Sequence, residues 1–227
     1  MIKNLKLENF FNNPTNPTNP TNPTTDREKK EIYGEVLTPF THIENMFNII
    51  PDSAFKDPTN KWLDPGTGTG NFSIYLYFKL LSGLDKVILD IEERKDHIIN
   101  NMIYMSEIQN DNIKILRNLF GSCANIHTHD FLANPINHHS PQDQTPNLSL
   151  QFDFIIGNPP FNSNGIKKVP TNSQLKKRHD GKTIWIDFVK KSISLLKPIT
   201  GKLCIFIPSI WMKPDKEKMY HYLTQYK

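Results

Sequence analysis

The chain has 227 residues, of which 37% are hydrophobic. This length and hydrophobic fraction suit one globular domain with a core of its own. No apolar run approaches the roughly 20 residues that are needed to cross a bilayer. Lys3, Lys6 and Glu8 interrupt the apolar residues at the N-terminus. We therefore expect neither a membrane span nor a signal peptide.

The formal net charge of +4 is mildly basic, which permits a polyanionic partner without requiring one. The two cysteines, Cys123 and Cys204, are far apart in the sequence. This spacing argues against a disulfide framework and fits the reducing cytoplasm, or a nucleus or viral factory if the host is a eukaryote or a virus.

The N-terminal part is of low complexity, because Asn13 to Thr24 repeats the triplet Asn-Pro-Thr four times. Regularly spaced proline disfavours helix, and the repeat contains nothing apolar to bury. We expect residues 1–31 to form an extension with an extended, solvated linker, and residues 32–227 to form the folded domain. Apolar residues at helical spacing after Thr41 predict a helix that ends before Pro51.

The body of the chain then alternates between strands and helices. We expect strands at 61–64, 86–91, 125–127, 152–156 and 202–207, and helices at 71–81, 94–109 and 183–196. This order predicts an α/β fold of Rossmann type, with a mostly parallel sheet covered by helices on both faces. Residues 133–150 are polar and are expected to form an insertion loop between two strands. His138 and His139 in that loop lack a third ligand at a suitable spacing, so no metal site is expected.

A glycine-rich turn, Asp64-Pro65-Gly66-Thr67-Gly68-Thr69-Gly70, links the first of these strands to the next helix. Glycines permit a tight turn and a close approach of the backbone to a ligand. The turn lacks the Gly-Lys-Ser/Thr ending of a phosphate-binding loop and the spacing of a dinucleotide-binding loop. Asp64 suits a ligand that carries a cation or an amine.

Acidic residues at the ends of the next two expected strands complete this arrangement. Asp90, with Glu92 as the alternative, is placed to accept hydrogen bonds from the two hydroxyls of a ribose. Asp130 could accept a hydrogen bond from an adenine amine, and Phe131 could pack on the adenine ring.

The strand at 152–156 ends in the turn Asn158-Pro159-Pro160-Phe161. The prolines stop the strand and leave the Pro159 carbonyl beside the Asn158 amide oxygen. Two adjacent acceptors match an amino group with two N–H donors, and Phe161 offers a face for stacking a planar base. Five basic residues follow, and phosphate contacts and a solvated loop explain them equally well: Lys167, Lys168, Lys176, Lys177 and Arg178.

The combined motifs resemble those of class I methyltransferases that depend on S-adenosylmethionine and methylate amino groups. Residues 34–40, which end in Thr38-Pro39-Phe40, resemble the N-terminal motif of adenine-N6 DNA methyltransferases of type I and fused type II restriction systems. The resemblance covers about residues 33–212 and makes residues 32–227 the catalytic domain. In such an enzyme the family's later strands and target-recognition domain would follow Lys227, so C-terminal strands are expected to be missing here.

The resemblance implies a role for each motif. Gly66, Gly68 and Gly70 would carry the amino-acid end of the cofactor near Asp64. Thr38 and Phe40 would complete the pocket. Asp90 would hold the ribose of the cofactor, and Asp130 would hold its adenine amine. Asn158, Pro159, Pro160 and Phe161 would form the catalytic turn that holds a flipped adenine. Expected partners are DNA and a specificity subunit or the missing C-terminal region. The alternatives are methylation of RNA adenine or protein glutamine, and an inactive or partner-dependent subunit.

Overall fold

The computed structural model describes residues 2–4, 38–136, 150–163, 183–213 and 218–226. Within these ranges, five parallel strands form one sheet in the order β3-β2-β1-β4-β5. Their bounds are β1 Trp62–Asp64, β2 Ile103–Ser106, β3 Asn125–His127, β4 Phe154–Gly157 and β5 Lys202–Ile205. β1 lies at the centre, where Leu63 is opposite Tyr104 of β2 and Ile155 of β4. The expected α/β fold is confirmed.

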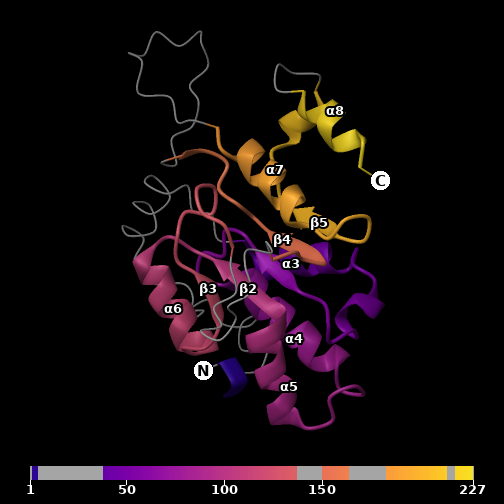
Figure 1. The fold of residues 1–227 in the computed structure, drawn as a ribbon, viewed down its shortest axis with the longest axis vertical. Coiled ribbons are helices and arrows are strands. Elements are labelled where there is room, and N and C mark those ends of the chain that lie inside the picture. Colours follow the sequence, from indigo (N-terminus) through magenta and orange to yellow (C-terminus); the bar gives the residue numbers. More distant parts are fainter. Residues whose placement is uncertain (1, 5–37, 137–149, 164–182, 214–217, 227) are drawn as a thin grey trace.

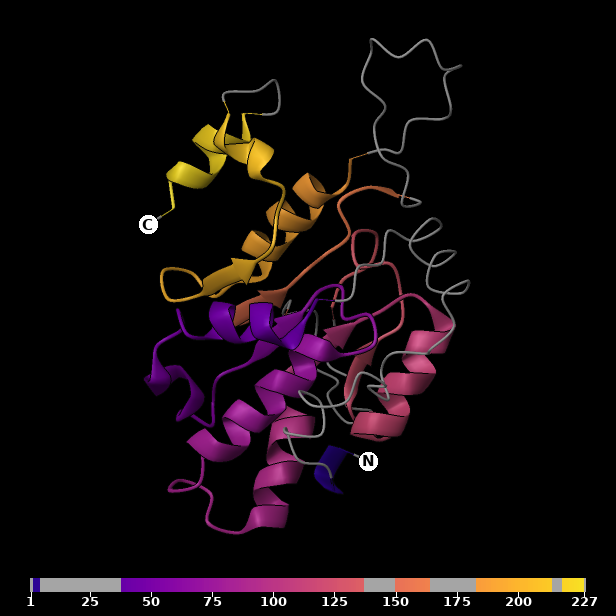
Figure 2. The same ribbon diagram turned by 180° about the vertical axis from the view of Figure 1, so that it is seen from behind.

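Helices cover both faces of the sheet (Figures 1 and 2). The helices of the first face are α3 (Phe40–Phe47), α4 (Asn71–Gly83), α5 (Ile91–His97) and α6 (Asn110–Phe120), together with the π-helical turn η3 (Ile98–Met102) and the 3-10 turn η2 (Asp52–Phe55). The second face carries α7 (Trp185–Leu195), over which lie η5 (Ser209–Met212) and α8 (Met219–Thr224).

Alternation along the central strands divides the core into two layers. Trp62, Ile103 and Ile156 pack toward the first set of helices. Their neighbours Leu63, Tyr104 and Ile155 belong to the cluster that contains residues of α7. Because successive side chains of a strand point to opposite faces, a fully buried three-residue strand serves both layers.

The helix α4 is apolar on nearly all sides, because it lies between the sheet and other helices. Its residues Phe72 to Tyr77 are all buried. On one side it contacts α3, where the rings of Phe47 and Tyr75 meet edge to face with centroids 5.0 Å apart. This packing fixes the start of α3, and with it Thr38, near the glycine loop that precedes α4.

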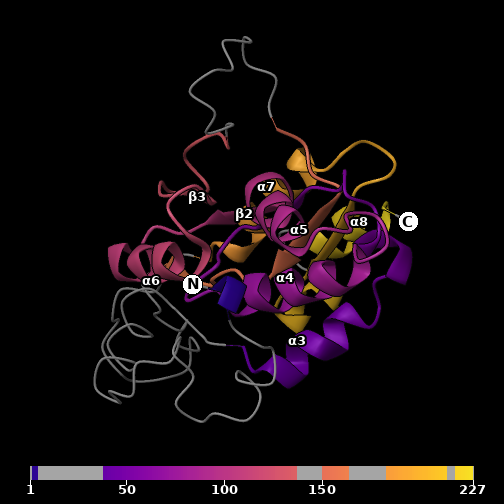
Figure 3. The same ribbon diagram turned by 90° about the horizontal axis from the view of Figure 1, so that it is seen from below.

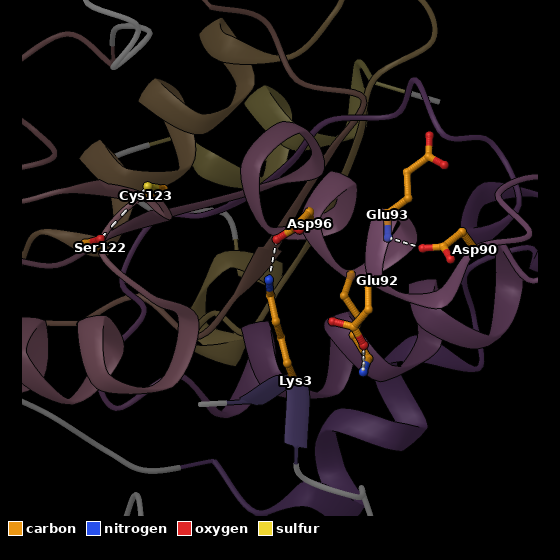
Figure 4. A network of polar contacts seen from close by, with 8 residues as sticks. Lys3, Asp90, Glu92, Glu93, Asp96, Ser122 and Cys123 are labelled. Carbon is orange, nitrogen blue, oxygen red and sulfur yellow. Dashed lines mark hydrogen bonds and ion pairs between the residues drawn. The ribbon is translucent and has the colours of Figure 1, made fainter.

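The N-terminal turn η1 (Ile2–Asn4) packs against α6 (Figure 3). It lies at the opposite end of the domain from α7 and α8 (Figures 1 and 2). Ile2 is completely buried in the first core layer. Lys3 forms an ion pair with Asp96 of α5 (Figure 4). Within the described ranges, no helix is long and apolar enough to span a bilayer.

Candidate active site at the carboxyl edge of the sheet

The glycine loop is held between the ends of neighbouring strands. The amide of Thr67 donates to the carbonyl of Ser106 at the end of β2, at 3.0 Å. A Cβ on Gly66 would lie 3.3 Å from Cα of Pro159, so this glycine packs directly on the Asn-Pro-Pro turn. Gly70 adopts a φ of 101° as it caps α4, and Gly68 has a φ of 57°. The structure therefore brings together the two motifs that the sequence singled out.

Asp64 is a buried acid at this edge. Its side chain is fully buried, and burial raises its pKa to about 7. The negative charge of Glu107 adds to this rise in the pKa, whereas hydrogen bonds from Gly66 and Ser73 oppose it. Among the described residues, Oδ1 of Asp64 has no hydrogen-bond partner. A buried carboxyl group with an unused oxygen favours a cationic or hydrogen-bond-donating ligand nearby.

The second strand is not where the sequence predicts it. Residues 86–91 form a turn and the start of α5, and Val87 and Leu89 are exposed. The expected helix at 94–109 is also wrong, because it divides into α5, η3 and the strand β2. Met102 and Met105 are both buried, but Met102 belongs to η3 and Met105 to the strand β2. A short apolar run fits either element, and the burial of β2 on both faces removes the alternation that marks a strand.

This difference moves Asp90 away from the carboxyl edge. Asp90 caps α5, where its Oδ1 accepts a hydrogen bond from the amide of Glu93 at 2.8 Å (Figure 4). The thirteen residues of α4, about 20 Å of helix, separate the glycine loop from the turn before Asp90. Glu92, the alternative, forms an ion pair with Lys95 in the same helix.

The acid that follows β2 is Glu107, which the sequence analysis missed. Its Oε2 accepts from the amide of Gly68 at 2.7 Å, and its Oε1 accepts from the amides of Ile108 and Gln109 at 2.8 and 2.7 Å. Glu107 is 7% exposed and lies beside the glycine loop. A weaker form of the β1 signal was present, because the apolar run at 103–105 is followed by Ser106 and then by the acid Glu107.

Asp130 and Phe131 follow β3 and differ in their surroundings. Asp130 is exposed three residues beyond β3, and its Oδ1 accepts from the amide of Leu132 at 2.9 Å. Phe131 is buried in the second core layer, where its ring stacks on Phe188 with centroids 5.1 Å apart. Lys191 lies over the same ring at 5.1 Å. Phe131 therefore packs against α7, which does not fit the expected contact with a cofactor ring.

The Asn-Pro-Pro-Phe turn follows β4, and the structure connects it to Thr38. Nδ2 of Asn158 donates to Oγ1 of Thr38 at 3.0 Å, across 120 positions of the sequence. Oδ1 of Asn158 is buried without a hydrogen-bond partner in the described part of the chain. Phe161 is 37% exposed, and its carbonyl accepts from the amides of Ile184 and Trp185 at the start of α7. Phe40, by contrast, is buried in the first core layer.

Several expected features lie outside the described residues. They are the Asn-Pro-Thr repeat, residues 34–37 of the N-terminal motif, the histidine pair and the basic residues at 167–178. Most of the polar insertion, residues 137–149, lies outside them as well.

Comparison with known proteins supplies a family and a fold. The family of Eco57I restriction-modification methylases matches residues 71–227, more than half of the chain. A modification subunit assigned to a type I restriction enzyme of Vibrio vulnificus YJ016 is 17% identical with a TM-score of 0.52, over 88% of this chain and 41% of that protein. The type I restriction enzyme EcoKI M protein is 19% identical with a TM-score of 0.51, over 78% of this chain and 35% of that protein.

At these identities the two solved structures are evidence for a shared fold. The chain spans less than half the length of either protein. A search of curated proteins found no match.

Proposed function

We propose, because this chain belongs to the family of Eco57I restriction-modification methylases, that it transfers a methyl group from S-adenosylmethionine to the N6 amine of an adenine flipped out of DNA. Residues 32–227 would form the catalytic domain of this adenine-specific DNA methyltransferase. The observation that carries the proposal is the Asn158 side chain at the carboxyl edge, next to the glycine loop.

The hydrogen bonds of Asn158 support recognition of an amine. Because Nδ2 donates to Thr38, the amide presents Oδ1 as an acceptor, and this oxygen has no partner among the described residues. A flipped adenine would donate one N6 hydrogen to Oδ1 and the other to the Pro159 carbonyl. Holding both hydrogens localises the lone pair on the nitrogen and aligns it for attack on a methyl group. Pro160 keeps the turn rigid.

Phe161 supports a planar substrate. An aromatic ring with 37% of its surface exposed, directly after the Asn-Pro-Pro turn, offers a base a stacking partner. The attachment of the Phe161 carbonyl to the start of α7 restrains the backbone at this residue. Stacking and the paired acceptors would together offset the few kcal/mol that extruding a base costs.

The acids around the glycine loop fit S-adenosylmethionine, which supplies an electrophilic methyl group on a cationic sulfur when it is bound. Asp64 and Glu107 lie close enough for the charge of one to raise the pKa of the other. Two neighbouring carboxylates disfavour a phosphate-bearing cofactor and favour one with a positive charge. We propose that Glu107 takes the ribose role expected of Asp90. Asp130 would bind the adenine amine of the cofactor, and Phe40 would border the pocket, with Thr38 beside Asn158.

We further propose that the target sequence is chosen by a specificity subunit or a target-recognition region. The chain spans less than half of the modification subunits whose fold it shares. As a member of the restriction-modification methylase family, the protein would act on DNA in the cytoplasm of its host.

The experiment is transfer of a labelled methyl group from S-adenosylmethionine to unmethylated DNA, followed by nucleoside analysis. Label in N6-methyladenine is expected. Asn158→Ala should lower the transfer rate at least about 100-fold and leave the Kd for S-adenosylmethionine unchanged. Asn48→Ala, an exposed asparagine after α3, is the matched control and should retain full activity.

The acceptors in the assay separate the alternatives. Label in RNA or in a protein substrate, with none in DNA, would refute the DNA assignment. Binding of S-adenosylmethionine without transfer to any acceptor, even with a specificity subunit added, would identify an inactive subunit. Full activity of Asn158→Ala would refute the amine geometry.

A further inference from the structure

The hydrogen bond between Thr38 and Asn158 joins the segment before α3 to the catalytic turn. From this contact we infer, on the basis of the proposed function, that Thr38 is a positioning residue for the Asn158 amide. Its hydroxyl would orient the catalytic acceptor, rather than bind the cofactor as the family resemblance implies.

The first support is the geometry of the pair. Oγ1 of Thr38 lies 3.0 Å from Nδ2 of Asn158 and accepts its hydrogen bond. Thr38 is 8% exposed, so the bond is largely shielded from water. A carboxamide has one acceptor oxygen and one donor nitrogen, and exchanging the two turns a hydrogen-bond acceptor into a donor. An acceptor that occupies Nδ2 leaves Oδ1 for the substrate amine.

The second support is that Thr38 is itself held in place. Its carbonyl accepts from Nδ2 of Asn71, the first residue of α4, at 3.0 Å. The next element, α3, is anchored by buried Phe40 and by the contact of Phe47 with Tyr75. Thr38 therefore sits on a rigid support that also carries the end of the glycine loop. A hydroxyl fixed in this way restricts the rotation of the Asn158 amide more than a mobile one would.

The third support is the burial of the group that Thr38 orients. Oδ1 of Asn158 is buried without a partner in the described structure. A buried amide oxygen without a hydrogen bond is unfavourable, so a substrate donor that reaches it removes this cost. The substrate donor can reach the amide oxygen only when Oδ1 of Asn158 faces the substrate, and the hydrogen bond to Thr38 favours that orientation.

Kinetics distinguish this role from cofactor binding. Thr38→Val keeps the shape of the side chain but cannot accept a hydrogen bond. We expect kcat for methyl transfer to fall about 3-fold to 100-fold, while KM and Kd for S-adenosylmethionine stay the same. Thr38→Ser restores the hydroxyl and should recover most of kcat. Thr41→Val, on the exposed side of α3, is the control and should leave kcat unchanged.

Nuclear magnetic resonance tests the contact without relying on activity. In protein labelled with 15N-asparagine, the Asn158 side-chain signal is identified by its loss in Asn158→Ala. Its amide protons should exchange slowly with solvent in the wild type and in Thr38→Ser, and faster in Thr38→Val.

Each result has a definite meaning. The positioning role is supported if the Asn158 amide protons exchange faster in Thr38→Val, kcat is lower and the Kd for S-adenosylmethionine is unchanged. An unchanged amide signal, or a weaker Kd at normal kcat, overturns it and leaves the proposed function standing. Failure of the proposed function is recognised separately, because wild-type protein would then transfer no methyl group to DNA while the amide signal still reports the contact.

Discussion

Replacement of Glu107 by glutamine tests the proposal that Glu107, rather than Asp90, binds the ribose of the cofactor. The change keeps the length and shape of the side chain and removes its charge. Within the described ranges, Oε2 of Glu107 accepts from the amide of Gly68, and Oε1 accepts from the amides of Ile108 and Gln109. Glutamine can accept hydrogen bonds at the position of only one of the two carboxylate oxygens. At the position of the other oxygen its NH2 group would face a backbone N–H donor.

The expected loss of affinity follows from these contacts. A hydrogen bond to a charged group contributes about 1.5 to 3 kcal/mol, and a ribose with two hydroxyls would lose one such acceptor. Glu107→Gln should therefore raise the Kd for S-adenosylmethionine about 10-fold to 150-fold. Isothermal titration calorimetry measures this change directly, and circular dichroism checks that the variant is folded.

Asp90→Asn is the matched control. Asp90 is an exposed helix cap, and asparagine caps helices about as well as aspartate. The Kd for S-adenosylmethionine should stay at the wild-type value. The reasoning would be refuted by the opposite result, a weak Kd in Asp90→Asn with a normal Kd in Glu107→Gln.

Two further predictions concern groups that the fold forces together. The pKa of Asp64 is about 7 in the folded protein against an ordinary value of 3.8, so the folded state holds a proton that the unfolded chain releases between about pH 4 and 7. This contribution to stability is complete below pH 4 and is lost as the pH rises to 7. Urea titrations should show that the free energy of unfolding falls less between pH 5 and pH 8 in Asp64→Asn than in the wild type. Equal falls in the two proteins would contradict the assigned pKa. Gly157→Ala places a Cβ 2.7 Å from Oδ1 of Asp64 at a φ of 146°, so it should lower stability by about 1 to 3 kcal/mol, and an unchanged melting curve would contradict this strain.

Local sequence determined the parts of this site that depend on backbone conformation. The glycines after Asp64 permit positive φ angles and the prolines after Asn158 fix φ, so both turns can be recognised without knowledge of the rest of the fold. The strands β1, β3, β4 and β5 and the helices α3, α4 and α7 lie where apolar spacing predicts them, within a few residues. Parallel strands of a Rossmann-type sheet then bring their ends to one edge.

The second strand and α6 show where this reasoning failed. The apolar run from Val87 to Leu89 is typical of a strand, yet Leu89 is 82% exposed in a turn. The strand β2 instead continues the apolar helical spacing of the residues before it, so the sequence predicts one long helix there. In α6 the buried stripe runs from Asn112 through Leu116 to Phe120, and its polar first residue hides the helical period. Burial of β2 depends on neighbours from distant parts of the chain, so no local window contains the information.

The sequence by itself determined the type of sheet, the glycine loop and the Asn-Pro-Pro-Phe turn, because each is encoded by consecutive residues. Only the tertiary structure decided which acid follows β2 and which group holds the Asn158 amide. Thr38 and Asn158 are 120 positions apart, and they meet because α3 packs on α4 while β4 lies beside β1. Contacts of this kind result from the packing of whole elements, which fixes side chains that no spacing rule relates.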